Sequence, residues 1–279
     1  MGGPAFRRIL AGTDGSPRAE EAARQAVRLA AALGASLEFL FVVDTTHPHV
    51  SDVEAEGEAA LARVGRLAAD AGVQTPTRLV AGEPAAALVE EARERGADLL
   101  CVGPDAGILG GAIRIGQVAA HVVREAPCSV LLAREAGPDF PRRVACGVDG
   151  SAGSVETAML AAQVAAATGA ELRLLHVIPV FRGDNAEWTL DPEEPSPPEL
   201  EPSVNAAVAR GVVPVREMAM GRPGSAIVAA ASRDGTDLVV VGHRGVSGVT
   251  RALLGSVSEH VTTHAPCSVI VARPRHEPS

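Results

Sequence analysis

The sequence predicts an α/β protein made of two consecutive domains, each with a parallel sheet covered by helices on both faces. Short apolar segments rich in β-branched residues alternate with alanine-rich amphipathic segments, and this alternation is typical of parallel sheets. The chain also repeats itself: residues 11–16 (AGTDGS) return as 146–151 (CGVDGS), and 126–130 (APCSV) return as 265–269. Because the displacement is 135 residues at first and 139 later, the repeat indicates duplicated globular domains and not a solenoid of short units.

The same criteria place each element in turn. Apolar runs predict strands that are buried on both faces, and amphipathic runs predict the helices between them. In the first domain we expect, in order, strand 8–13, helix 17–33, strand 36–43, helix 53–71, strand 77–81, helix 84–95, strand 98–102, helix 117–125 and strand 129–133. The second domain repeats this order from Arg143, with its second helix shortened to about 203–210. The short link 136–141 contains prolines, so we place the domains at 1–137 and 138–279.

One segment differs between the two repeats. The displacement changes by four residues between positions 178 and 221, where the second copy carries the acidic, proline-rich stretch 191–202. This indicates a remodelled loop. The acidic segment 182–202 is interpreted either as a surface for a protein partner or as a disordered loop.

Composition excludes several classes of protein. The 279 residues carry a net charge of −9 and only 2% aromatic residues, which argues against a nucleic-acid surface and against base-stacking platforms. No signal-like segment and no long apolar run occurs, so we expect a cytoplasmic protein without a membrane partner. The four cysteines lie in or beside apolar runs without a CxxC pair, which predicts buried reduced thiols: Cys101, Cys128, Cys146 and Cys267.

The most informative motif is a glycine loop in the second domain. Gly242 follows the apolar run 237–241, Gly245 and Gly255 follow at defined spacings, and Ser256 stands where a helix begins. A strand, a glycine-rich loop and a helix start together present free backbone N–H groups to a phosphate, and glycine lets the ligand approach the backbone. The motif therefore predicts an anion or nucleotide site, with a plain strand-to-helix turn as the alternative.

These residues resemble the universal stress protein family over nearly the whole chain. The motif Gly-x2-Gly-x9-Gly-Ser is complete in the second domain, and Asp-Gly-Ser turns and Gly-x-Pro motifs accompany it in both domains. The resemblance implies two tandem Rossmann-like domains, each an open five-stranded sheet in order 3-2-1-4-5, paired through their last strands. It also implies ATP binding and a role in stress resistance and signalling. A homodimer is a further possibility, and the protein partner is unknown.

The resemblance also implies a set of binding residues in the second domain. Asp149 would face the ribose or help to hold Mg²⁺, although it could also cap the turn at Gly150. The backbone of Val177 would meet adenine, and the glycine loop would hold the phosphates. Arg244 and Arg251 would either neutralise phosphate charge or be solvated. The implied ATP-binding residues are Gly147, Val148, Asp149, Val177, Val241, Gly242, Arg244, Gly245, Gly255, Ser256 and Val257.

The first domain departs from this pattern. With the displacement of 139, Ala106 stands opposite Gly245 and Gln117 opposite Ser256, and Pro104 removes a backbone donor. An alanine methyl would occupy space that a phosphate needs. We therefore predict that this domain binds nucleotide weakly or not at all and serves as the structural partner of the second domain.

The remaining polar residues give no enzyme signature. His260 and His264 are four residues apart on a helix and could hold a metal, but a solvated helix face is the simpler interpretation, and His243 could contact phosphate. No P-loop, no Gly-x-Ser-x-Gly motif and no catalytic base is identified. The sequence favours a nucleotide-dependent regulatory protein. The alternatives are a slow ATPase or nucleotidyl-transfer enzyme, and a structural dimerisation protein that binds no nucleotide.

Overall fold

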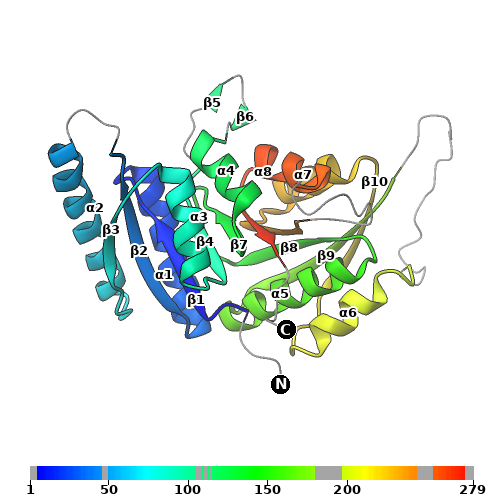
Figure 1. Ribbon diagram of the computed structural model, residues 1–279. Helices are drawn as coiled ribbons and strands as arrows, with labels where there is room; N and C mark the ends of the chain where they lie inside the picture. Colours follow the sequence, from blue (N-terminus) through cyan, green and yellow to red (C-terminus); the bar gives the residue numbers. More distant parts are fainter. Residues whose placement is uncertain are drawn as a thin grey trace.

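The computed structural model describes residues 5–45, 50–104, 108–109, 112–113, 115–179, 197–243 and 254–273. The first domain contains β1 (Arg8–Gly12), α1 (Pro17–Leu33), β2 (Ser36–Val43), α2 (Val50–Asp70), β3 (Thr77–Ala81), α3 (Pro84–Glu94), β4 (Leu99–Val102), β5 (Ile108–Leu109), β6 (Ala112–Ile113), α4 (Gln117–Glu125) and β7 (Ser129–Leu132). The second domain contains β8 (Arg143–Val148), α5 (Ala152–Thr168), β9 (Glu171–Ile178), α6 (Glu201–Val208), β10 (Val215–Met220), α7 (Pro223–Asp234), β11 (Leu238–Gly242), α8 (Ser256–His264) and β12 (Ser268–Ala272). Figure 1 shows the two domains side by side.

One ten-stranded sheet runs through both domains. Its order is β10-β9-β8-β11-β12-β7-β4-β1-β2-β3, so each domain has the order 3-2-1-4-5 that the resemblance implies. In this sheet all strand pairs within a domain are parallel, whereas the last strands, β7 and β12, pair antiparallel and join the two halves. The parallel α/β fold is therefore confirmed. The small hairpin β5–β6 was not predicted, because two-residue strands have no periodicity to recognise.

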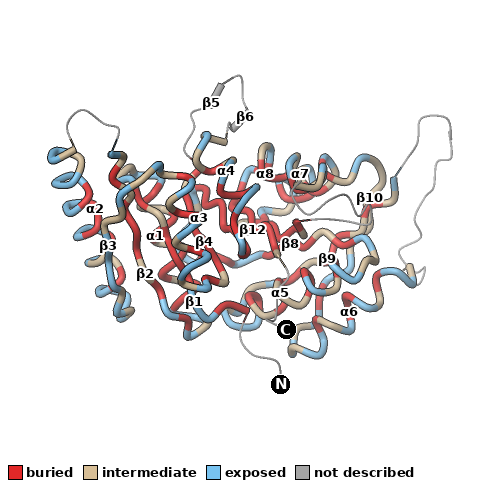
Figure 2. The backbone as a smooth tube through the Cα atoms, in the orientation of Figure 1, coloured by how far each residue is buried: buried red, intermediate tan, exposed pale blue. Residues whose placement is uncertain are grey.

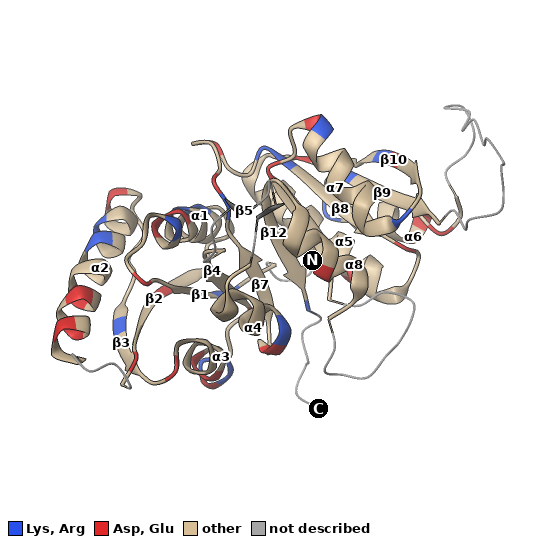
Figure 3. Cartoon of the chain, turned by 90° about the horizontal axis from the view of Figure 1, so that it is seen from above, with Lys and Arg blue, Asp and Glu red and all other residues tan. Residues whose placement is uncertain are grey.

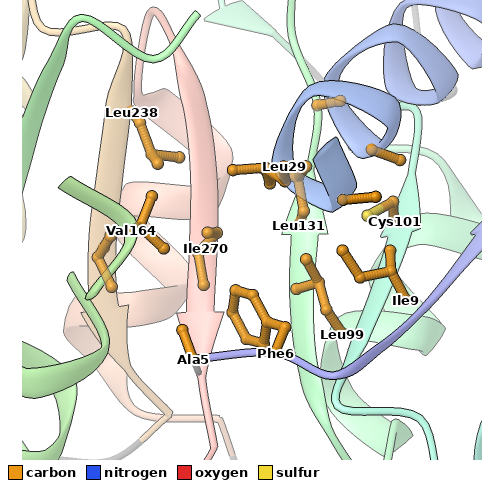
Figure 4. Close-up of a cluster of buried hydrophobic side chains, with 14 of the residues drawn as sticks. Ala5, Phe6, Ile9, Leu29, Leu99, Cys101, Leu131, Val164, Leu238 and Ile270 are labelled. Carbon is orange, nitrogen blue, oxygen red and sulfur yellow. The ribbon is translucent and has the colours of Figure 1, made fainter. Parts of the chain in front are cut away.

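Helices cover both faces of the sheet and enclose two cores. The core on one face is formed against α1, α2, α5 and α6, and the core on the other against α3, α4, α7 and α8. In the view from above, α1 and α3 lie on opposite sides of the first domain's strands, and charged residues lie along the outer helix α2 (Figure 3). Figure 2 shows that the strands are buried and that exposure is concentrated on the outer sides of the helices. The first core is continuous across the domain boundary, where Leu131 of β7 and Ile270 of β12 belong to one cluster (Figure 4).

Local signals set the ends of the helices that begin each domain. Ser16 precedes α1 and its Oγ accepts a hydrogen bond from the backbone of Ala19 at 3.2 Å, which satisfies a donor that the helix itself cannot. Gly34 ends the helix at φ 63°, a left-handed conformation that glycine adopts without a Cβ penalty. In the second domain Ser151 caps α5 in the same way. Both helices therefore start directly after the first strand, beside the carboxyl edge of the sheet.

Two arginines related by the repeat lock the domains together. Arg134 follows β7, and its guanidinium donates to the carbonyl oxygens of Thr262 and Cys267 in the second domain. Arg273 follows β12, and its Nη2 donates at 2.7 Å to the carbonyl oxygens of Val123 and Arg124 in the first. Arg134 is only 4% exposed, and burial lowers the pKa of its guanidinium. These contacts fix the C-terminal parts of α4 and α8 across the domain boundary.

Candidate functional site

A cavity of about 270 Å³ lies at the carboxyl edge of the second domain's sheet. In an open parallel sheet this is where ligands bind, because the strand order reverses there and neighbouring loops diverge. Strands β8, β9 and β11 and the starts of α7 and α8 contribute its walls. The lining residues are Gly147, Val148, Asp149, Ser154, Leu175, Val177, Pro223, Ile227, Val241, Gly242, Gly255, Ser256, Val257 and Ser258.

The fold brings most of the predicted site residues to this cavity. The predicted residues that line it are Gly147, Val148, Asp149, Val177, Val241, Gly242, Gly255, Ser256 and Val257. Arg244, Gly245 and Arg251 lie outside the described residues. Sequence reasoning did not assign five residues of the walls to the site, which are Ser154, Leu175, Pro223, Ile227 and Ser258. The Gly-x-Pro motif contains Pro223, and Leu175 precedes Val177 by one strand period, so signals for these two were present in the sequence.

The start of α8 forms the polar end of the cavity. The backbone N–H of Gly255 donates to the carbonyl of His243 at 3.0 Å, which brings the chain back to the end of β11. Gly255 is the N-cap of α8 and provides no side-chain acceptor. Ser258 Oγ donates to the carbonyl of Gly242 at 2.5 Å and holds the first helical turn against the strand. The first N–H groups of a helix have no partner within the helix, so they can bind an anion at this end.

Asp149 has a structural role in the turn after β8. Its Oδ1 accepts hydrogen bonds from the backbone N and the Oγ of Ser151 at 3.1 and 2.6 Å, which is the Asx-type turn that the sequence offered as an alternative. The residue also lines the cavity, so the two interpretations are compatible. Gly150 adopts φ +78°, and a Cβ there would lie 2.8 Å from Cβ of Glu199, so the turn requires glycine.

The opposite end of the cavity is apolar and closely packed. Leu175, Val177, Ile227 and Val241 are each at most 7% exposed and form its walls. Gly147 forms the floor, where a Cβ would lie 2.8 Å from Cδ1 of Ile227. Apolar walls with a few polar groups nearby are typical of small-molecule sites. The cavity thus combines an apolar end with an anion-binding end.

The cavity offers few groups for metal binding or proton transfer. Asp149 is the one carboxylate among its described lining residues, and no cluster of three metal-ligating side chains occurs in the described part of the chain. A single carboxylate fits Mg²⁺ that is held mainly by phosphate and water oxygens. His260 and His264 stack with their ring centroids 4.2 Å apart and do not line the cavity. Burial, and then the charge of His264, lowers the pKa of His260.

The first domain has a cavity of the same volume at the equivalent place. It measures about 270 Å³, and the N–H of Gly116 donates to the carbonyl of Pro104 at 3.0 Å, as Gly255 does to His243. The Asp-Gly-Ser and Gly-x-Pro motifs that the two domains share supply Asp14, Ser16 and Pro84 to its lining. Its lining residues are Gly12, Thr13, Asp14, Ser16, Arg18, Ala19, Leu40, Val42, Pro84, Leu88, Val102, Gly103 and Val118.

A larger cavity, of about 520 Å³, lies between α4 and α8 at the domain boundary. Ile115 and Arg124 of the first domain and Leu254 and Glu259 of the second are among its lining residues. It shares no lining residue with the strand-end cavities, although Leu254 and Glu259 flank the segment 255–258 that lines the cavity of the second domain. No helix among the described residues is long and apolar enough to cross a membrane.

Comparison with known proteins identifies a family. The model of the universal stress protein family matches residues 5–134 and 141–273. A universal stress protein of Methanocaldococcus jannaschii is 31% identical over 142 residues, which cover 47% of this chain and 83% of that protein. The crystal structure of a universal stress protein from Archaeoglobus fulgidus has a TM-score of 0.74 at 21% identity, covering 99% of this chain and 98% of that one, and so shares the fold.

A further solved universal stress protein was crystallised in complex with cAMP. It is 30% identical, and the alignment covers 47% of this chain and 99% of that one with a TM-score of 0.40.

Proposed function

The chain belongs to the universal stress protein family, and on this basis we propose that it is an ATP-binding regulatory protein whose second domain holds the nucleotide. The observation that supports this most directly is the cavity at the end of β11. The cavity is lined both by apolar side chains and by the start of α8, which has no side-chain cap. It lies in the domain that carries the complete glycine motif.

Each end of the cavity fits one part of ATP. Adenine would lie between the apolar walls, with the backbone of Val177 beside it, and Asp149 would accept hydrogen bonds from the ribose. The phosphates would lie against Gly242, Gly255 and the first N–H groups of α8, where the helix dipole favours negative charge. Gly245, outside the described residues, would allow the backbone of the loop to approach the phosphates.

The donor set also fits Mg²⁺ carried by the nucleotide. Asp149 would supply one carboxylate oxygen, directly or through water. Phosphate oxygens of the nucleotide and water molecules would supply the other ligands of the ion. The ion would offset phosphate charge in a cavity that has no basic residue among its described lining residues.

The same residues favour binding over catalysis. General acid–base catalysis needs a group with a suitable pKa within hydrogen-bond reach of the reacting atom. Among the described lining residues the one titratable side chain is Asp149, which already accepts two hydrogen bonds from Ser151. We therefore propose a role that depends on whether nucleotide is bound, and not on rapid turnover.

Calorimetric titration of nucleotide-stripped protein with Mg-ATP tests this proposal. We expect one site per chain, and we expect Gly245→Asp to abolish it, because an aspartate in the loop adds both bulk and negative charge where phosphate must lie. Ala106→Asp is the matched control, since Ala106 is the equivalent position in the first domain. It should leave the stoichiometry and the affinity unchanged.

The stoichiometry separates the possible outcomes. Two equal sites per chain would contradict the prediction that Ala106 and Gln117 impair the first domain. Absence of binding to the wild-type chain, confirmed with a labelled nucleotide, would overturn the proposal and favour a structural role.

A further inference from the structure

We propose that His260 and His264 of α8 form a binding site for a divalent transition-metal ion of the Zn²⁺ type. Neither histidine lines any of the three cavities described above, so the site is separate from the nucleotide. It is also distinct from Mg²⁺ carried by the nucleotide, because imidazole nitrogen favours zinc, nickel and copper ions, whereas phosphate and carboxylate oxygens favour Mg²⁺.

The two imidazole rings lie side by side on one face of the helix. Residues four apart are neighbours on a helix surface, and these ring centroids are 4.2 Å apart with an angle of 20° between the ring planes. A bond from zinc to histidine nitrogen is about 2.0–2.1 Å long, so two nitrogens on one ion lie at most about 4 Å apart. The stacked rings are therefore close to the separation that one ion can bridge.

A backbone hydrogen bond sets the tautomer of His264. Its Nδ1 lies 2.9 Å from the carbonyl oxygen of His260, and because a carbonyl can only accept, Nδ1 carries the proton and donates it. The lone pair of the neutral ring is then on Nε2. Histidines that bind metals donate their other ring N–H to a carbonyl or carboxylate in this way, which orients the ring and makes the binding nitrogen more basic.

Helix α7 holds the ring of His260. A Cβ on Gly224 would lie 2.8 Å from Cβ of His260 and 3.0 Å from its Cγ and Cδ2, so the start of α7 packs directly against this edge of the ring. Nε2 of His260 lies 3.3 Å from Oγ of Ser225, which is also in α7. With Ser225 Oγ as the acceptor for Nε2–H, the lone pair of His260 is on Nδ1 and is the one that binds the ion.

The surroundings favour a neutral ring and a bound cation. Burial, and then the charge of His264, lowers the pKa of His260, so this ring is unprotonated at neutral pH. His264 is the last residue of α8, where the unpaired carbonyl groups of a helix favour positive charge. No third metal-ligating side chain joins the pair in the described part of the chain, so water molecules would complete the coordination.

The first domain lacks this arrangement. With the displacement of 139, His121 of α4 stands at the position of His260, but Glu125 stands at that of His264. Ala86 replaces the serine of α7 and has no hydroxyl group to orient the ring. The first domain thus offers a histidine at the same place in the fold without a second imidazole, and this provides a matched control.

Titration of the full-length chain with zinc chloride, followed by NMR of the imidazole Cε1–H groups, tests the proposal. We expect the signals of His260 and His264 to shift together with one dissociation constant, while Mg²⁺ at the same concentration shifts neither. His264→Ala should weaken Zn²⁺ binding at His260 at least about tenfold, because one ligand no longer holds the ion beside the other. Ser225→Ala should weaken it about tenfold, since loss of an outer hydrogen bond costs about 10–100-fold in metal affinity.

His121→Ala is the matched control and should leave the signals of His260 and His264 and their dissociation constant unchanged. Zn²⁺ should also raise the melting temperature of the wild-type chain more than that of His264→Ala, because the ion binds the folded pair. Absence of shifts at either ring, or different dissociation constants for the two, would overturn the proposal. An unchanged affinity at His260 in His264→Ala would also overturn it, because each histidine would then bind the ion alone. All titrations are made without nucleotide, so their outcome does not depend on ATP binding.

Discussion

Replacing Gly147 by alanine should weaken ATP binding in the second domain. A Cβ at this position would lie 2.8 Å from Cδ1 of Ile227 and 3.7 Å from Cγ1 of Val241. Non-bonded carbon atoms do not approach so closely, so the Ile227 side chain must move. Because Ile227 lines the cavity, it would move into the space that the ligand needs. Overpacking of this kind costs about 1–3 kcal/mol of stability. Because an extra carbon in an apolar pocket changes affinity by about tenfold or more, we expect a loss of that size for ATP.

The first domain supplies the matched control. In Gly12→Ala the new Cβ would lie 3.0 Å from Cδ2 of Leu88, so it perturbs the equivalent floor of the other cavity. Both variants should melt earlier, by about 2–4 °C for each kcal/mol lost. Calorimetric titration with Mg-ATP should show weaker binding only in Gly147→Ala. An unchanged affinity in Gly147→Ala, with the expected fall in melting temperature, would refute the placement of the nucleotide against this floor.

Three other perturbations have defined outcomes. Ser258→Ala removes the hydrogen bond to the carbonyl of Gly242 and should cost about 0.5–1.5 kcal/mol in urea denaturation, together with some ATP affinity. Arg134→Met leaves two carbonyls of the second domain without their buried donor and should cost about 1–3 kcal/mol, and an unaffected urea midpoint would show that these bonds contribute nothing net. Burial raises the pKa of Cys146 from 9.0 to about 12. Between pH 9 and the pKa of the folded state, this thiol ionises only in the unfolded chain. Its contribution to the free energy of unfolding should therefore be fully present below pH 9 and fall by about 1.4 kcal/mol per pH unit above it, until the folded pKa is reached. Burial also raises the pKa of the other three cysteines, so urea denaturation at pH 7 and pH 10 of the wild-type chain and of Cys146→Ala measures this as the difference between the two chains.

The fold was predictable because local signals agree with the overall topology. Helix 17–33 and strands 36–43 and 77–81 occur as predicted, since proline, glycine and serine mark their ends. The second helix begins at Val50 and not at residue 53, because its first turn carries Ser51 and Asp52, which apolar periodicity does not detect. The shortened helix of the second domain occurs at Glu201–Val208, two residues before its predicted place.

The two cavities differ in how far the sequence revealed them. The second was predictable at its polar end, where one continuous motif places Gly242, Gly255 and Ser256 together. The apolar walls come from separate strands and helices that only the strand order brings together, so no local pattern marks them. The apolar walls of the first cavity also come from separate elements, so no local pattern marks them either. Its glycine motif is incomplete, and Arg18 lies on a different helix from the one that the motif predicts.

The domain boundary links the first domain to the site in the second. Arg134 donates to the carbonyl of Thr262 near the end of α8, and Ser256 at the start of the same helix lines the cavity. The hairpin strand β6 of the first domain also lies beside α8. Because α8 is a rigid helix of nine residues, a shift at its C-terminal end would also move its N-terminal end. We therefore expect Arg134→Met to weaken ATP binding as well as stability, whereas Arg273→Met, which releases α4, should lower stability alone. Equal effects on ATP affinity would show that the first domain does not position the phosphate end of the site.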